Sequence, residues 1–132
     1  MFRKSISTRF IAFITICMML FMISCATFVR NSYRSLSTAG ETYDATMKSA
    51  ADLYRKGVID DEQKAKIVEI AIKYKMSYDI AVDALDAYNE TSSVEAKDRY
   101  MKAFAEFTPI LQELIELVQE FKKSDTSSDS TS

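Results

Sequence analysis

The sequence predicts an all-α protein, with a small antiparallel three-helix bundle after an N-terminal signal or transmembrane helix. Only two glycines and one proline occur in 132 residues, so the backbone has few places to turn sharply. Apolar residues recur at alternating steps of three and four along three segments, which is typical of one buried face on an α-helix. Cap signals separate these segments, so we expect three helices and no sheet.

The N-terminus has the pattern of a targeting signal. Arg3, Lys4 and Arg9 precede an apolar run that extends from Phe10 to Ile23. A basic region followed by such a run directs a chain to export, and residues 1–24 are therefore predicted to be a signal peptide.

The end of the apolar run, Met22-Ile23-Ser24-Cys25, resembles the lipobox of bacterial lipoproteins. The resemblance implies that the signal is cut before Cys25, that the sulfur of Cys25 carries diacylglycerol, and that its new amino group takes a further acyl chain such as palmitate. Cys25 is thus the expected lipidation site, and membrane lipid is the first expected partner. Ala26 follows it, and the absence of aspartate at that place favours the outer membrane if the source is Gram-negative.

The same residues leave two alternatives open. Residues 10–29 are almost continuously apolar, and at ~1.5 Å per residue an uncleaved helix of this length would cross a hydrocarbon core of roughly 30 Å. Ser24-Cys25-Ala26 also suits ordinary signal peptidase, which would release a protein that begins at Thr27. In every case the basic N-terminus stays in the cytoplasm and the rest of the chain lies outside it, in the cell envelope.

The first helix of the bundle is expected over residues 31–56. Gly57 stands where a left-handed C-terminal cap belongs, and Arg55 and Lys56 in the last turn suit the helix dipole. Its apolar face is predicted to consist of Tyr33, Leu36, Gly40, Tyr43, Met47, Ala50 and Tyr54.

The second helix is expected to begin after Asp60 and to end near Asn89. Asp60 with Gln63 resembles a capping box, in which two side chains satisfy each other's free backbone N–H groups. Its predicted buried face comprises Ile67, Ala71, Tyr74, Tyr78, Ala81, Leu85 and Tyr88, widened by Ile70, Met76 and Val82.

The third helix is expected to follow a second capping box, Ser92 with Glu95. Thr108-Pro109 inside it predicts either a kink or a restart with Thr108 as the new cap. The buried face is predicted as Tyr100, Phe104, Phe107, Leu111, Leu114, Val118 and Phe121. Short connections make sequential helices antiparallel, so residues 25–123 are predicted to form one bundle domain.

Charges along the second helix support the antiparallel arrangement. Its early lysines and late acidic residues oppose its own dipole, so neighbouring helices must compensate. Antiparallel packing brings the acidic end beside basic residues of the other two helices. The groups concerned are Lys64, Lys66, Lys73 and Lys75 early, and Asp79, Asp83, Asp86 and Glu90 late.

Residues 124–132 contain only serine, threonine and aspartate, and we expect a disordered polar tail there. After position 25 the chain carries fourteen basic and nineteen acidic residues, a net charge of −5. We therefore do not expect a basic nucleic-acid-binding domain.

The residue types that usually carry out catalysis are missing from the predicted bundle. The chain has no histidine, and both cysteines, Cys17 and Cys25, lie in the N-terminal apolar segment. Serine–histidine and cysteine–histidine nucleophiles and histidine-containing metal sites are therefore excluded. The four carboxylates from Asp79 to Glu90 follow one helix face, and a row does not converge on a cation, so we expect solvated or paired side chains. No catalytic, cofactor-binding or metal-binding residue is predicted, no cofactor and no small-molecule substrate.

All seven tyrosines fall on the predicted faces, as expected for a bundle core with hydroxyls at its rim. The first face, rich in tyrosine, alanine and glycine, could instead be partly exposed for a protein partner or for self-association. We therefore expect a non-enzymatic lipoprotein that displays a helical interaction module in a structural, assembly or exclusion role. The alternative is a single-pass component of a membrane complex with an uncleaved anchor, and an envelope enzyme or metal-binding protein ranks below both.

Overall fold

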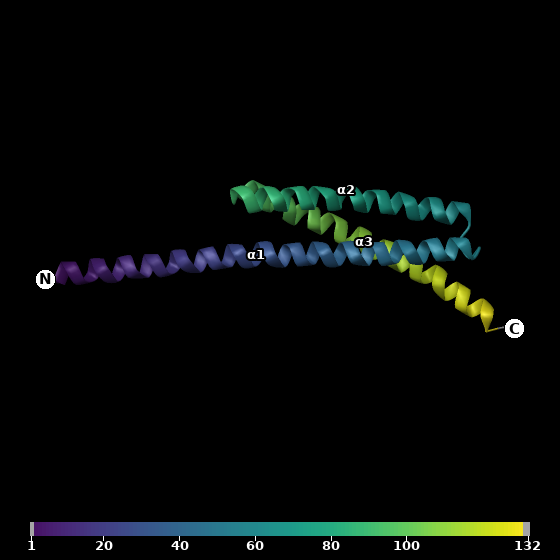
Figure 1. Cartoon of the computed structure of the whole chain (residues 1–132), viewed down its shortest axis with the longest axis horizontal. Helices are drawn as coiled ribbons and strands as arrows, with labels where there is room; N and C mark the ends of the chain where they lie inside the picture. Colours follow the sequence, from purple (N-terminus) through teal and green to yellow (C-terminus); the bar gives the residue numbers. More distant parts are fainter. Residues whose placement is uncertain (1, 131–132) are drawn as a thin grey trace. The chain divides into compact units, whose positions relative to one another are not determined.

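The computed structural model describes the backbone of residues 2–130, and it describes side chains at residues 14–17, 19 and 26–130. Within these residues the chain is helical and contains no strand, so the all-α class is confirmed. The helices are α1 (Phe2–Arg55), α2 (Asp61–Thr91) and α3 (Val94–Asp129), joined by short turns (Figure 1).

The chain divides into two compact units, Met1–Arg34 and Ser35–Ser132, which are described separately. The first unit is the N-terminal part of α1, and the lipobox-like residues 22–25 lie outside the described side chains. No helix is both long and apolar enough to cross a membrane, within the residues that could be searched.

The second unit begins with the last turns of α1, which end as the glycine predicts. Gly57 has φ of +77°, the left-handed conformation. Its N–H donates to the Tyr54 carbonyl at 3.0 Å, and that of Val58 donates to the Leu53 carbonyl at 3.0 Å. These two bonds form a Schellman motif, which satisfies carbonyls that the end of a helix leaves free.

The start of α2 is the predicted capping box. The Gln63 N–H donates to the Asp60 carboxylate at 2.8 Å, and the Asp60 N–H donates to the Gln63 side-chain oxygen at 3.0 Å. Two of the first N–H groups of the helix are thereby satisfied.

The start of α3 differs from the prediction by one residue. Ser92 instead ends α2, with φ of +52° and its N–H bonded to the Tyr88 carbonyl at 2.8 Å. Ser93 is the N-cap of α3, and its hydroxyl oxygen accepts the Ala96 N–H at 3.3 Å. Ser92 with Glu95 has the spacing of a capping box, but the prediction was wrong because α2 uses Ser92 for its own end.

Helix α3 passes through Pro109 without interruption, so the predicted restart is wrong. The Thr108 hydroxyl donates to the Phe104 carbonyl four residues earlier at 2.6 Å, rather than capping a new helix.

Helix α3 also continues to Asp129, where the sequence predicts disorder from Ser124 on. Several hydroxyls in this stretch donate to the carbonyl four residues earlier, as Ser124 does to Glu120 at 3.1 Å. No glycine or proline follows Pro109 to break the helix.

One core cluster joins the three helices of the second unit. It is formed by Ala50, Leu53, Ile59, Ile67, Ile70, Leu114 and Val118, and Leu85, Phe107 and Tyr74 are also fully buried. Residues 50–53 thus pack near residues 67–70 and 114–118.

Several side chains depart from the predicted faces. Leu53 and Ile59 are buried although they were assigned to no face, while Tyr33 and Tyr54 are each 37% exposed. The face of α1 continues from Ala50 by a step of three, which selects Leu53. Met76 is exposed because it lies two positions after buried Tyr74, about 200° around the helix.

Candidate functional site

An aromatic cluster lies where the three helices of the second unit meet. The Tyr43 and Tyr74 rings stack with centroids 4.6 Å apart and planes 16° from parallel. Phe107 meets Tyr74 edge to face at 5.6 Å and meets Tyr78 at the same distance. Such geometries are favourable for ring pairs beyond the area that they bury, so the cluster fixes α1 and α2 against α3 at this level.

Tyr74 is buried with its hydroxyl unsatisfied. The oxygen has no hydrogen-bond partner within the part of the chain that the structure describes. Burial raises the pKa of Tyr74 well above its usual range. The negative charges that Tyr78, Tyr43 and Asp44 carry when ionised raise this pKa further. The phenol therefore stays neutral, and its missing partner costs stability.

Tyr78 uses its hydroxyl to join α2 to α1. It donates to the Leu36 carbonyl at 2.9 Å and lies directly over Gly40. A Cβ at position 40 would be 3.1 Å from this oxygen, closer than ordinary contact. Gly40 thus lets the two helices approach at the tyrosine.

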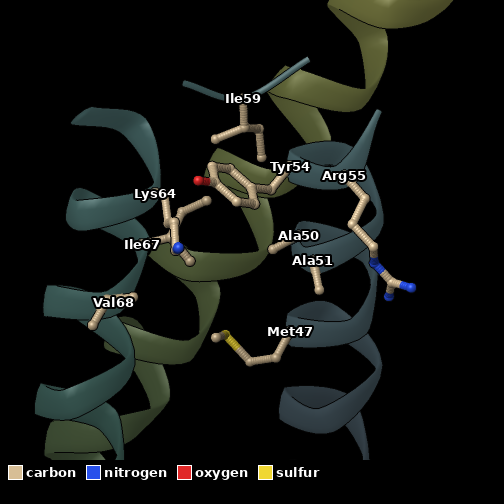
Figure 2. A pocket seen from close by; sticks show the side chains of 9 residues that line it. All are labelled: Met47, Ala50, Ala51, Tyr54, Arg55, Ile59, Lys64, Ile67 and Val68. Carbon is tan, nitrogen blue, oxygen red and sulfur yellow. The ribbon is translucent and has the colours of Figure 1, made fainter. Parts of the chain in front are cut away.

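An apolar groove opens between α1 and α2 on the side of the turn that connects them (Figure 2). The hollow has a volume of about 310 Å³. Met47, Ala50 and Ala51 of α1 face Ile67 and Val68 of α2 across it, with Tyr54, Arg55, Ile59 and Lys64 at its upper edge.

The upper edge of the groove is held in place by polar contacts. The Tyr54 hydroxyl donates to Asp61 at 2.7 Å, and the Lys64 ammonium lies 4.2 Å from the centre of the Tyr54 ring. Arg55 points away from the hollow in Figure 2 and pairs with Asp52 at 2.9 Å. Lys64 is therefore the cation that lies over this end of the groove.

A second hollow of about 310 Å³ adjoins the first and shares Met47 and Val68 with it. Tyr43, Ile72 and Met76 line it, and Lys75 and Asp79 stand at its rim. The two hollows together follow the boundary between α1 and α2 over several turns.

Helix α2 borders this groove with a row of exposed apolar side chains. Val68, Ile72, Met76 and Ile80 are 42%, 55%, 63% and 47% exposed. Their spacing of four places them in succession along the outer side of the helix. Val68, Ile72 and Met76 also line the hollows, whereas Ile80 lines neither of them. Methionine and branched aliphatic side chains around a groove are typical of surfaces that bind another helix.

Charge changes sign along the same helix. Residues 64–75 contain four lysines and Glu69, a net charge of +3, while residues 79–90 contain four carboxylates and no cation. Lys73 pairs with Glu69 at 2.8 Å within the helix. This pairing lowers the pKa of Glu69 and raises that of Lys73.

The acidic row consists of Asp79, Asp83, Asp86 and Glu90, all of which are exposed on α2. No group of three or more metal-ligating side chains converges within the described residues. The row is thus a charged surface beside the groove in this structure. Cys25, the expected lipidation site, lies outside the described side chains.

The exposed row was not identified from the sequence. Its signal is the step of four from Val68 to Ile80, but Met76 was instead assigned to the buried face. The neighbouring buried residues follow the same period, so the periodicity alone does not say which of two apolar rows is covered.

No family model, curated protein or solved structure matches this chain.

Proposed function

We propose that this protein is a non-enzymatic lipoprotein, anchored in the bacterial cell envelope through Cys25, that displays its second unit as a helical interaction module. The observation that supports an interaction role is the apolar row from Val68 to Ile80 beside the α1–α2 groove. Contiguous exposed apolar surface with a polar rim is typical of sites that bind another protein.

The module is proposed to be an antiparallel three-helix bundle with the anchor at its N-terminal side. The shared core cluster and the aromatic contacts of Tyr43, Tyr74 and Phe107 support this arrangement. A structural, assembly or exclusion role in the envelope follows from an anchored module that binds rather than transforms its partner.

The anchor is tested by metabolic labelling with a fatty acid in a bacterial host. The wild-type chain is expected to take up label and to lose residues 1–24, whereas Cys25→Ala stays full length and unlabelled. Cys17→Ala is the matched control, and it is expected to be labelled normally. An unlabelled wild-type chain that keeps its N-terminus contradicts the lipoprotein proposal.

An unlabelled wild-type chain that keeps its N-terminus would favour the second candidate, a single-pass component of a membrane complex. The helical backbone of α1 continues without a break through residues 10–29, which favours a retained helical segment. Extraction with alkaline carbonate separates the candidates from a released chain, because a released protein leaves the membrane fraction.

A further inference from the structure

We propose that the α1–α2 groove and the outer side of α2 form the interface of an antiparallel dimer, whose second partner is another copy of this chain. The proposal names the partner of the interaction module proposed above and rests on that module, but not on lipidation of Cys25.

The apolar contact is the first argument. The row from Val68 to Ile80 covers twelve residue steps, about 18 Å of helix axis. The two hollows beside it make the surface concave on the side of α1. A helix of the second copy fits such a groove with apolar side chains every three or four residues, which is the pattern that α2 itself presents.

Charge decides the direction of that helix. A parallel copy of α2 would place the lysine-rich residues 64–75 of the two copies side by side. It would do the same with the acidic residues 79–90, so like charges would face each other. An antiparallel copy places the half with a net charge of +3 beside the half with four carboxylates, twice in one interface. Such a surface is self-complementary under a two-fold axis, as the interface of a symmetric dimer must be.

The change of sign also fixes the register. It falls between Lys75 and Asp79, so the two-fold axis passes near Met76. Met76 then lies against Met76 of the second copy. Ile72 lies at the same height along the helix as Ile80 of the second copy, and Lys75 lies near Asp79 of the second copy. Lys75 and Asp79 both stand at the rim of one hollow, which keeps the pair at the edge of the apolar contact.

An anionic lipid surface fits the same face less well. The lysines around Val68 and Ile72 would attract it, but Asp79 and Asp83 continue the exposed side of the helix and would repel it. A concave groove also offers a flat bilayer little contact.

The test measures the mass of the full chain in a mild detergent, so that no membrane fixes the orientation of the copies. Sedimentation equilibrium is expected to show a dimer for the wild type and for Cys25→Ala. Met76→Asp is expected to weaken association at least tenfold, because it sets a carboxylate against its own copy. Met101→Asp, at a similarly exposed methionine of α3, is the control and is expected to associate normally.

Charge variants test the direction. Lys75→Glu and Asp79→Lys each place like charges at both contacts and are expected to weaken the dimer severalfold. The chain that carries both changes is expected to recover wild-type association, because an acidic side chain at position 75 of one copy then meets a basic one at position 79 of the other. Circular dichroism confirms that each variant keeps its helices.

Three results overturn the proposal. The first is a wild type that remains monomeric up to millimolar concentration, and the second is a double variant no better than either single one. The third is a monomeric chain that binds phosphatidylglycerol vesicles through Met76, which would assign this face to lipid. Because Cys25→Ala is measured beside the wild type, loss of the anchor and loss of the dimer are separate outcomes.

Discussion

The hydroxyl of Tyr78 donates a hydrogen bond to the carbonyl oxygen of Leu36 at 2.9 Å, across 42 positions of sequence. The bond joins α2 to α1 beside Gly40, whose missing side chain leaves room for the tyrosine. Tyr74, one helical turn earlier, has no such partner among the residues that the structure describes. Two tyrosines on one helix face thus have opposite effects on stability, and this difference can be measured.

Tyr78→Phe should destabilise the second unit by about 1 kcal/mol, the usual net value of one hydrogen bond. The ring contact with Phe107 is retained, so the loss reports the hydroxyl alone. Urea unfolding followed by circular dichroism gives the free energy of unfolding.

Gly40→Ala should depend on which residue occupies position 78. In the wild type the gain in helix propensity, about 1 kcal/mol, is offset by a Cβ 3.1 Å from the Tyr78 oxygen. In the Tyr78→Phe background the nearest remaining neighbour is the ring carbon at 3.7 Å, so the same change should stabilise. A double-mutant cycle in urea tests this, and strictly additive effects would show that the close approach has no energetic consequence.

Tyr74→Phe should stabilise the protein by about 1 kcal/mol, because it removes a buried hydroxyl without a partner. The stacking on Tyr43 and the edge contact with Phe107 do not need the oxygen. A lower urea midpoint for the variant would show that the hydroxyl has a partner outside these contacts.

The sequence predicted most of the fold because its caps and buried faces are local signals. Gly57 and the Asp60–Gln63 box were identified correctly, since both depend on residues within one turn of the helix end. Ser92 has a glutamate three positions later and Ser93 an alanine, so the spacing selects Ser92, whereas the geometry of the turn makes Ser93 the cap.

The candidate site was less predictable, because it depends on which of two neighbouring apolar rows is covered. Ile67 and Val68 are adjacent, both are apolar and both line the groove, yet Ile67 is buried and Val68 is exposed. That choice is made by how α1 and α3 pack against α2. The unsatisfied hydroxyl of Tyr74 is likewise a consequence of packing that no spacing rule contains.

Gly57→Ala should destabilise by about 1 kcal/mol through the backbone alone. The residue has φ of +77°, which a Cβ disfavours, and a Cβ there would meet nothing within 4 Å. Gly57→Asn is the matched control, because asparagine tolerates the left-handed region better and should lose less. Equal losses in the two variants would point to a cause other than the conformation of the backbone.

Alkaline pH should unfold the protein through its tyrosines. Burial is the first cause that raises the pKa of Tyr74, Tyr43 and Tyr78 above the ordinary tyrosine value near 10. In the unfolded chain these phenols lose their protons near pH 10, whereas in the folded chain they keep them to higher pH. Their contribution to stability is therefore complete below pH 10 and is lost progressively as the pH rises above it.

Tyr74→Phe should make the loss of stability with rising pH less steep, because Tyr74 has the largest pKa shift of the three. The measurement is the urea midpoint from pH 8 to pH 11, and an identical decline in wild type and Tyr74→Phe would show that Tyr74 ionises as easily in the folded chain as in the unfolded one.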